Sequence, residues 1–373
     1  MKRIVLVMLV LCGAVAWLDA QEAVTPQRDP FIITIDPKML GADLGIGYRG
    51  FSIIPEADTV FWLIAGGSYE WLAFYRLPDN TLYTEASGYD PIDDPPYTRL
   101  SGRLDLGIAQ GLAFNESIDA NLFEIFLFYK TRYDYVVDDP GAIELILEST
   151  LPDRRSIFQN SLFLGLSYND LNTSDPHLVY HGIYGEMSAE WGPKLLFNNL
   201  LGKADFVRLN ATVKGFLPLF DLDPESTANT LSAYAGAFFA VDYIAGDTIP
   251  INIQQTIGGR YPRPGLGRAV RGFEDFRFDG LFKTVLNLEF RLNLPQYTVI
   301  DTVTPGLFFF FDSGYYNFIY YNESGFLFSL GAGVYVNVWK LTSLHAYTAL
   351  LLNRPRADGS YWVPLLFLLS FHF

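Results

Sequence analysis

The chain has 373 residues, half of them hydrophobic and 16% aromatic, and its 41 acidic residues outnumber its 26 lysines and arginines. The formal net charge of −15 argues against a nucleic-acid partner. Beyond residue 20 no window offers eighteen apolar residues free of charge, which excludes membrane-spanning helices.

Residues 1–20 have the build of a secretory signal peptide, because two basic residues precede an unbroken apolar run. The ending Leu18-Asp19-Ala20 suits cleavage, which predicts an exported domain at 21–373. Cys12, the only cysteine, leaves with the signal, so the exported chain has no disulfide or cysteine-ligated metal. A lipoprotein signal at Cys12 is a weaker alternative, because a bulky residue precedes the cysteine.

Apolar and polar residues then alternate in segments of the length expected for transmembrane β-strands. In 281–295 the even-numbered residues are mostly apolar and the odd-numbered ones mostly charged or polar, and 103–108, 207–214 and 326–338 repeat this split. The pattern predicts fourteen strands, at about 39–54, 58–76, 98–114, 119–135, 155–168, 178–191, 204–218, 230–244, 249–258, 280–294, 304–316, 324–338, 341–353 and 361–373.

Backbone groups in lipid must find their hydrogen-bond partners within the protein, so an all-β chain that crosses a bilayer requires a closed barrel. No linker rich in proline, glycine and serine divides residues 21–373, which predicts one domain, a transmembrane antiparallel β-barrel. Residues 90–96, 138–141 and 221–229 are predicted to be polar loops and turns. The segment 142–149 fits an extra strand or a helix in a loop.

The longest predicted loop, at 258–280, holds five arginines in an otherwise acidic chain. A loop of this length in a compact fold is usually functional or disordered, and this one contains too many aromatic residues for simple disorder. We therefore expect it to carry function.

Four segments in this part of the chain match a known pattern. Val270-Arg271-Gly272-Phe273 is followed by Asn287-Leu288-Glu289-Phe290-Arg291, by Phe310-x-Asp312-x-Gly314 and by the glycine-rich segment 329–334. In this order they resemble the VRGF loop, the FxDxG strand and the late strands of the BamA/TamA/FhaC superfamily, also called the bacterial surface antigen family. Barrels of that superfamily insert or export outer-membrane proteins.

The resemblance implies that the loop folds back into the barrel and that Arg271 pairs there with Asp312. Alternation places Glu289 on the same inner face, where the planar guanidinium of Arg271 can bridge both carboxylates. Gly272 would let the loop backbone pass close to the wall, and Phe273 would anchor it. The alternative is that Arg271 caps a surface loop, against lipopolysaccharide phosphates.

The superfamily uses sixteen strands, five of them after the motif loop, and five predicted strands follow the loop here. We therefore expect sixteen strands, with two short N-terminal ones merged among the fourteen. Only ten to fifteen residues precede the first predicted strand, too few for the POTRA domains that such relatives carry, each of roughly seventy to eighty residues. The resemblance thus implies a barrel-only member, with a separate periplasmic partner as one possibility.

The last predicted strand alternates large apolar residues up to Phe373. This ending, with Leu369 and Phe371, resembles the C-terminal β-signal by which bacterial outer-membrane barrels are recognised by their assembly machinery. The expected location is therefore the bacterial outer membrane, among its lipids and lipopolysaccharide.

The leading functional hypothesis is a barrel that aids the insertion or transport of proteins or lipids. A passive, cation-preferring channel is the first alternative, because the chain is acidic. An outer-membrane enzyme is the least favoured, since the histidines accompany no nucleophile motif. No cofactor or metal is predicted.

Overall fold

The computed structural model describes residues 29–38, 40–72, 97–136, 156–173, 177–200, 204–226, 228–260, 266, 270–273, 280–296, 303–318, 323–338, 342–355 and 359–371. The predicted signal peptide, the segment 142–149 and Phe373 lie outside these residues. No helix in the described part is long and apolar enough to span a membrane.

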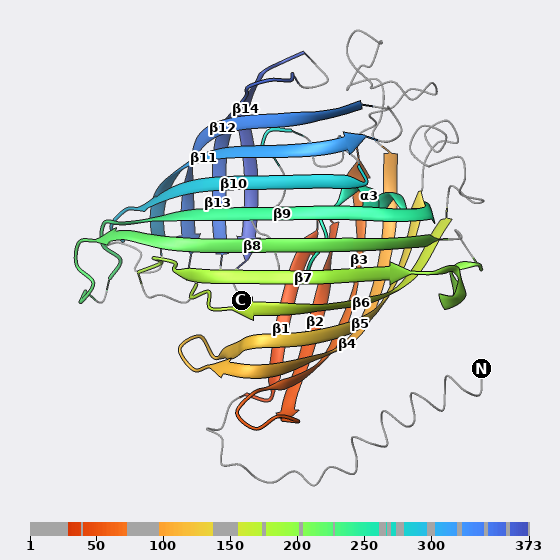
Figure 1. Cartoon of the computed structure of the whole chain (residues 1–373). Coiled ribbons are helices and arrows are strands. Elements are labelled where there is room, and N and C mark those ends of the chain that lie inside the picture. The colour runs from red at the N-terminus through yellow and green to blue at the C-terminus, as the bar shows by residue number, and fades with distance from the viewer. Residues whose placement is uncertain are drawn as a thin grey trace.

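The described residues form one antiparallel sheet of fourteen strands, each hydrogen-bonded to its neighbours in chain order, as the all-β prediction requires. Figure 1 shows this sheet curling round on itself, so that it has an inner and an outer face. Among the described residues no ladder joins the first strand to the last, so the predicted closure by strand pairing is not seen. The strands are β1 (Phe31–Lys38), β2 (Leu40–Phe51), β3 (Thr59–Leu72), β4 (Tyr97–Asn115), β5 (Ala120–Val136), β6 (Ser156–Asn169), β7 (Gly182–Gly192), β8 (Asp205–Asp221), β9 (Ser232–Thr248), β10 (Phe282–Asn293), β11 (Val303–Phe318), β12 (Glu323–Val338), β13 (Thr342–Leu351) and β14 (Trp362–Phe371).

The alternation predicted from the sequence is confirmed in the strands. In β10 the side chains of Lys283 and Asn287 are buried on the inner face, while Leu288 is exposed on the outer face. In β8 Arg208 is buried and Leu209 is exposed. The outer face is therefore apolar and the inner face polar, the reverse of a water-soluble protein.

The list of predicted strands is wrong in two places. The predicted strand at 249–258 contains instead a short helix, α3 (Ile251–Gln255), and β1 was not predicted. Ile253 is buried, and the ammonium of Lys283 donates to the carbonyls of Gln254 and Thr256 at the C-terminal end of the helix. The expected sixteen strands are likewise not found among the described residues, which form fourteen.

The last strand departs from the predicted alternation at one point. A bulge opposite β13 lies between Tyr347 and Ala349, so Val363 points inward and is buried while Leu365 stays exposed on the outer face. Pro364 lies within this bulge and cannot donate a backbone hydrogen bond, which explains why the regular ladder is interrupted there.

Successive connections lie at alternate ends of the sheet, because successive strands run in opposite directions. The longest connections, residues 73–96, 137–155 and 249–281, share one end. That end also has the short connections at residue 39 and at 319–322, whereas no connection at the other end is longer than the twelve residues 170–181. The motif loop therefore starts from the end that carries the long connections.

Candidate functional site

Two carboxylates lie close together on the inner face of β10 and β11. Asn287 pairs with Asp312 across the ladder, and Glu289 pairs with Phe310 two residues further on. The side chains of Glu289 and Asp312 are both buried. Two like charges side by side without water would be strongly unfavourable unless a cation joined them.

Arg271 is that cation. Its Nε and Nη2 donate to the two oxygens of Asp312, each at 2.8 Å, and its backbone N–H donates to Asp312 Oδ2 at 2.9 Å. Its Nη1 donates to Glu289. One planar guanidinium thus bridges both carboxylates, the geometry that arginine allows and lysine does not.

A second arginine completes the charge balance. Arg291, on the same strand as Glu289, donates through Nε to Glu289 Oε1 and lies 5.3 Å from the ring centre of Tyr335. Two guanidinium groups therefore meet two carboxylates in a buried cluster with no net charge. Such a cluster fixes geometry more than it adds stability, because each ion was removed from water to form it.

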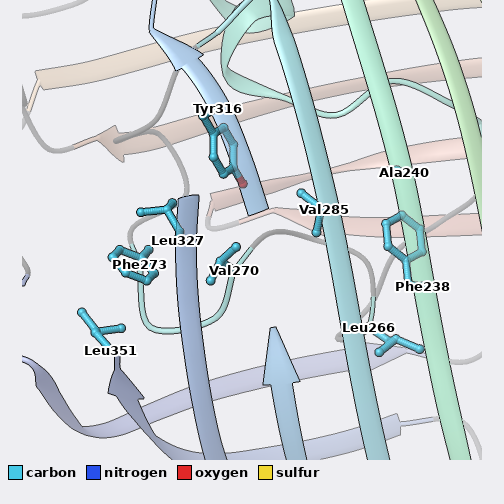
Figure 2. Packing of buried hydrophobic residues seen from close by; sticks show 9 residues of the cluster. All are labelled: Phe238, Ala240, Leu266, Val270, Phe273, Val285, Tyr316, Leu327 and Leu351. Atoms are coloured by element: carbon cyan, nitrogen blue, oxygen red, sulfur yellow. The ribbon is translucent and has the colours of Figure 1, made fainter. Parts of the chain in front are cut away.

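The residues on either side of Arg271 are held by apolar packing. Val270 and Phe273 are buried, and Figure 2 shows Phe273 beside Leu327 and Leu351 while Val270 faces Val285. Leu266, earlier in the loop, joins the same cluster. The loop is thus attached to the inner wall at several points around Arg271.

Gly272 has a backbone φ of +90°, in the left-handed region that favours glycine. A Cβ at this position would lie 2.7 Å from Ala349 Cβ and 2.9 Å from Leu351 Cδ2, closer than carbon atoms approach. Any other residue would therefore strain the turn and push the loop off the wall.

Each of the three motif residues Phe310, Asp312 and Gly314 on β11 contacts the loop. The guanidinium carbon of Arg271 lies 3.8 Å from the centre of the Phe310 ring, which is a cation–π contact. Asp312 accepts three hydrogen bonds from Arg271. A Cβ on Gly314 would lie 2.8 Å from Val270 Cγ2, so the glycine leaves room for the loop. Phe310, Asp312 and Gly314 are two residues apart on β11, so they share its inner face and can all contact the loop.

The loop has a second attachment that sequence reasoning missed. The backbone N–H of Arg260 donates to both oxygens of Glu186 on β7, at 3.0 Å each, and its guanidinium pairs with Glu124 on β5. The guanidinium carbon also lies 4.6 Å from the ring centre of Phe126. The loop thus contacts β5 and β7 near its start and β10 and β11 near its end, crossing the interior of the curled sheet.

A third attachment lies at the start of the loop. Asp242, fully buried on β9, accepts hydrogen bonds from Arg208, Asn210 and the backbone N–H of Gly258. The ammonium of Lys283 lies 3.8 Å away. These contacts fix α3 and the first loop residues inside the sheet, and no motif in the sequence indicated them.

The remaining predicted residues are placed only in part. Leu369 and Phe371 lie on β14, opposite Leu344 and Thr342 of β13, and Phe373 lies outside the described residues. Within the described part of the chain no group of histidine, cysteine, aspartate and glutamate could hold a metal ion.

The fold is similar to solved structures, whereas no protein-family model and no curated protein matches the chain. A BamA from Haemophilus ducreyi lacking POTRA domains 1–3 matches with a TM-score of 0.53 at 10% identity, over 92% of this chain and 64% of that one. CdiB from Acinetobacter baumannii matches with a TM-score of 0.48 at 16% identity, over 88% and 50%. CdiB from Escherichia coli matches with a TM-score of 0.49 at 12% identity, over 92% and 67%. The chain therefore has the fold of the BamA β-barrel and spans less than two thirds of that BamA chain.

Proposed function

We propose that this chain is an integral β-barrel of a bacterial outer membrane, exported by the signal peptide at 1–20, that aids the insertion or transport of proteins or lipids. The observation that carries the proposal is the motif loop inside the sheet, with Arg271 joined to Asp312 and Glu289. A BamA-like fold and the four sequence segments of the BamA/TamA/FhaC superfamily support the same conclusion.

The membrane location is supported by the outer face. Its large apolar side chains are exposed along the strands, including Leu209, Val213, Leu288 and Val334. In water this surface would be an aggregation hazard, whereas in a bilayer it is the expected lipid contact. Outer-membrane barrels have short periplasmic turns and long external loops, so the end with the long connections is assigned to the cell exterior.

The edges of the sheet support a role in handling other chains. In the described structure β1 pairs only with β2, and β14 only with β13. An edge strand is a template on which another strand can form hydrogen bonds. Edges of this kind favour strand insertion over passive conduction, because conduction uses no free edge.

A passive cation-preferring channel is the alternative, favoured only by the acidic composition. The loop that crosses the interior from β5 to β11 obstructs an open pore. In addition, the buried residues 178–180 pack against the inner face near the other end of the sheet. Asn293 helps to hold them there by donating to the carbonyl of Leu178. We therefore rank insertion or transport above passive conduction.

The test measures insertion directly. Liposomes containing the folded protein receive a urea-unfolded eight-stranded outer-membrane barrel, and its folded, heat-modifiable fraction is followed over time. We expect faster folding than in empty liposomes, slower folding with D312A, and no change with G102A, whose added Cβ meets no atom within 4 Å. Rates equal to those of empty liposomes, together with a high cation flux, would establish the channel instead.

A further inference from the structure

The connection between β7 and β8 does not form a simple hairpin. Residues 193–200 include a short π-helical turn, η2 (Lys194–Asn198), that folds back along β6. It lies at the right-hand end of β7 and β8 in Figure 1, the end with the long connections. The residues of this turn are arranged with polar groups inside and apolar groups outside.

Asn198 holds the turn against the sheet. The ladder between β6 and β7 begins only at Leu162 and Trp191, so the backbone of Asn160 lies beyond it. The side-chain amide of Asn198 takes the place of the missing strand: Asn160 N–H donates to its Oδ1 at 2.6 Å, and its Nδ2 donates to Asn160 O at 2.9 Å. Asn198 is fully buried in this position.

The turn also hides a polar side chain on the outer face. Asn160 is on the same side of β6 as Leu164, which is exposed, yet Asn160 itself is buried. Its Oδ1 accepts from Thr131 at 2.9 Å, and its Nδ2 donates to the carbonyl of Leu196 at 2.8 Å. In water this amide would need no cover, whereas in hydrocarbon it would be costly to leave bare.

The outer side of the turn is apolar. Leu195, Phe197 and Leu200 are exposed to 72%, 51% and 69%. Phe197 has a φ of +66°, a backbone conformation that a bulky residue rarely adopts and that costs on the order of 1–3 kcal/mol. A turn facing water is normally polar and built from residues that favour turns.

The residues next to the turn indicate where it lies between the apolar outer face and water. Trp191 on β7 and Val207 on β8, the strands that flank the turn, are apolar and exposed on the outer face. Lys194 pairs with Asp205 at 3.0 Å and with Asp247 at 3.5 Å, and the Asp247 side chain is 82% exposed. Because exposed charged groups require hydration, water must lie close to the turn.

We propose that Leu195, Phe197 and Leu200 are inserted into the lipid of the adjoining leaflet, just below the level of Lys194. The turn thereby covers Asn160 and Thr131 with apolar surface and extends the lipid contact of β6 to β8. This inference rests on the proposed membrane location, and its test separates the two.

The experiment uses single cysteines in a C12S background, since Cys12 is the only native cysteine. An environment-sensitive fluorophore is attached at F197C or, in case the turn relaxes there, at L200C. Nanodiscs with and without brominated phosphatidylcholine report lipid contact, and iodide reports water contact. L209C, at an exposed position on the outer face of β8, is the lipid reference, and D223C, exposed at the opposite end, is the water reference.

We expect the turn sites to be quenched by brominated lipid as L209C is, and D223C to be quenched by iodide. Quenching of L209C by lipid while both turn sites respond to iodide would overturn the inference and leave the membrane location intact. Turn sites shielded from both quenchers would also overturn it, and would indicate that a second protein chain covers the turn. Iodide quenching at L209C as well would overturn the membrane location itself.

Discussion

Arg271 brings a permanent positive charge into the interior of the sheet, where strand alternation has already placed two carboxylates. The motif made its pairing with Asp312 predictable, and alternation alone added Glu289. The partners of Arg260 were not predictable, because Glu186 and Glu124 lie 74 and 136 residues away and belong to no local pattern. A contact across the interior depends on the curvature of the whole sheet, which one sequence does not express.

Removing either partner of the Arg271 pair should be costly. R271A leaves two carboxylates facing each other and D312A leaves a buried guanidinium with one partner fewer, each at on the order of 3–5 kcal/mol of unfolding free energy. The double variant should be milder than the sum, because both single changes remove the same Arg271–Asp312 interaction. Urea unfolding of the heat-modifiable form of all four proteins measures this, and strict additivity would mean that the two side chains do not interact.

Gly272 should tolerate no side chain. G272A places a Cβ 2.7 Å from that of Ala349 at a φ of +90°, which we expect to lower the unfolding free energy by about 1–3 kcal/mol. G102A is the matched control, since its Cβ would meet nothing within 4 Å and stability should hardly change. Equal urea midpoints for the two variants would show that the loop does not press against β13.

At the scale of elements, most strands were predictable because an apolar outer face and a polar inner face impose a period of two. The failures have local causes. Ile251 and Ile253 alternate as in a strand, but both lie in α3, whose C-terminal end accepts hydrogen bonds from Lys283 on β10. In β1, two adjacent isoleucines and Pro37 obscure the alternation, and the inward turn of Val363 depends on a bulge at Pro364.

The loop at 258–280 should lose its contacts to β5 and β7 without losing those to β10 and β11. The side chain of Arg260 is 28% exposed and that of Arg271 8%, so R260A should cost only about 1–2 kcal/mol, through a lost ion pair and cation–π contact. We expect protease to cut the loop faster in R260A while the heat-modifiable form persists. K194A, which removes an exposed charge elsewhere, should behave like the parent. A loop cut equally fast in all three proteins would show that Arg260 does not hold it.

At the scale of the molecule, the fold class was predictable from alternation and composition, whereas the predicted closure by pairing of the first and last strands is not seen among the described residues. Fourteen strands curl around a loop that is attached to both sides of the interior. The outer face is apolar and the inner face carries nearly all of the buried charge. The proposed contact of the outer face with lipid would account for this arrangement.

Heat-modifiability of the protein extracted from membranes tests that account most directly. Because its strands are held by a continuous ladder inside a lipid-facing surface, the unheated protein should resist urea and migrate faster on gels than the boiled protein. It should also sediment with the outer membrane. Recovery of the exported chain as a soluble monomer, with the same mobility before and after boiling, would contradict the account.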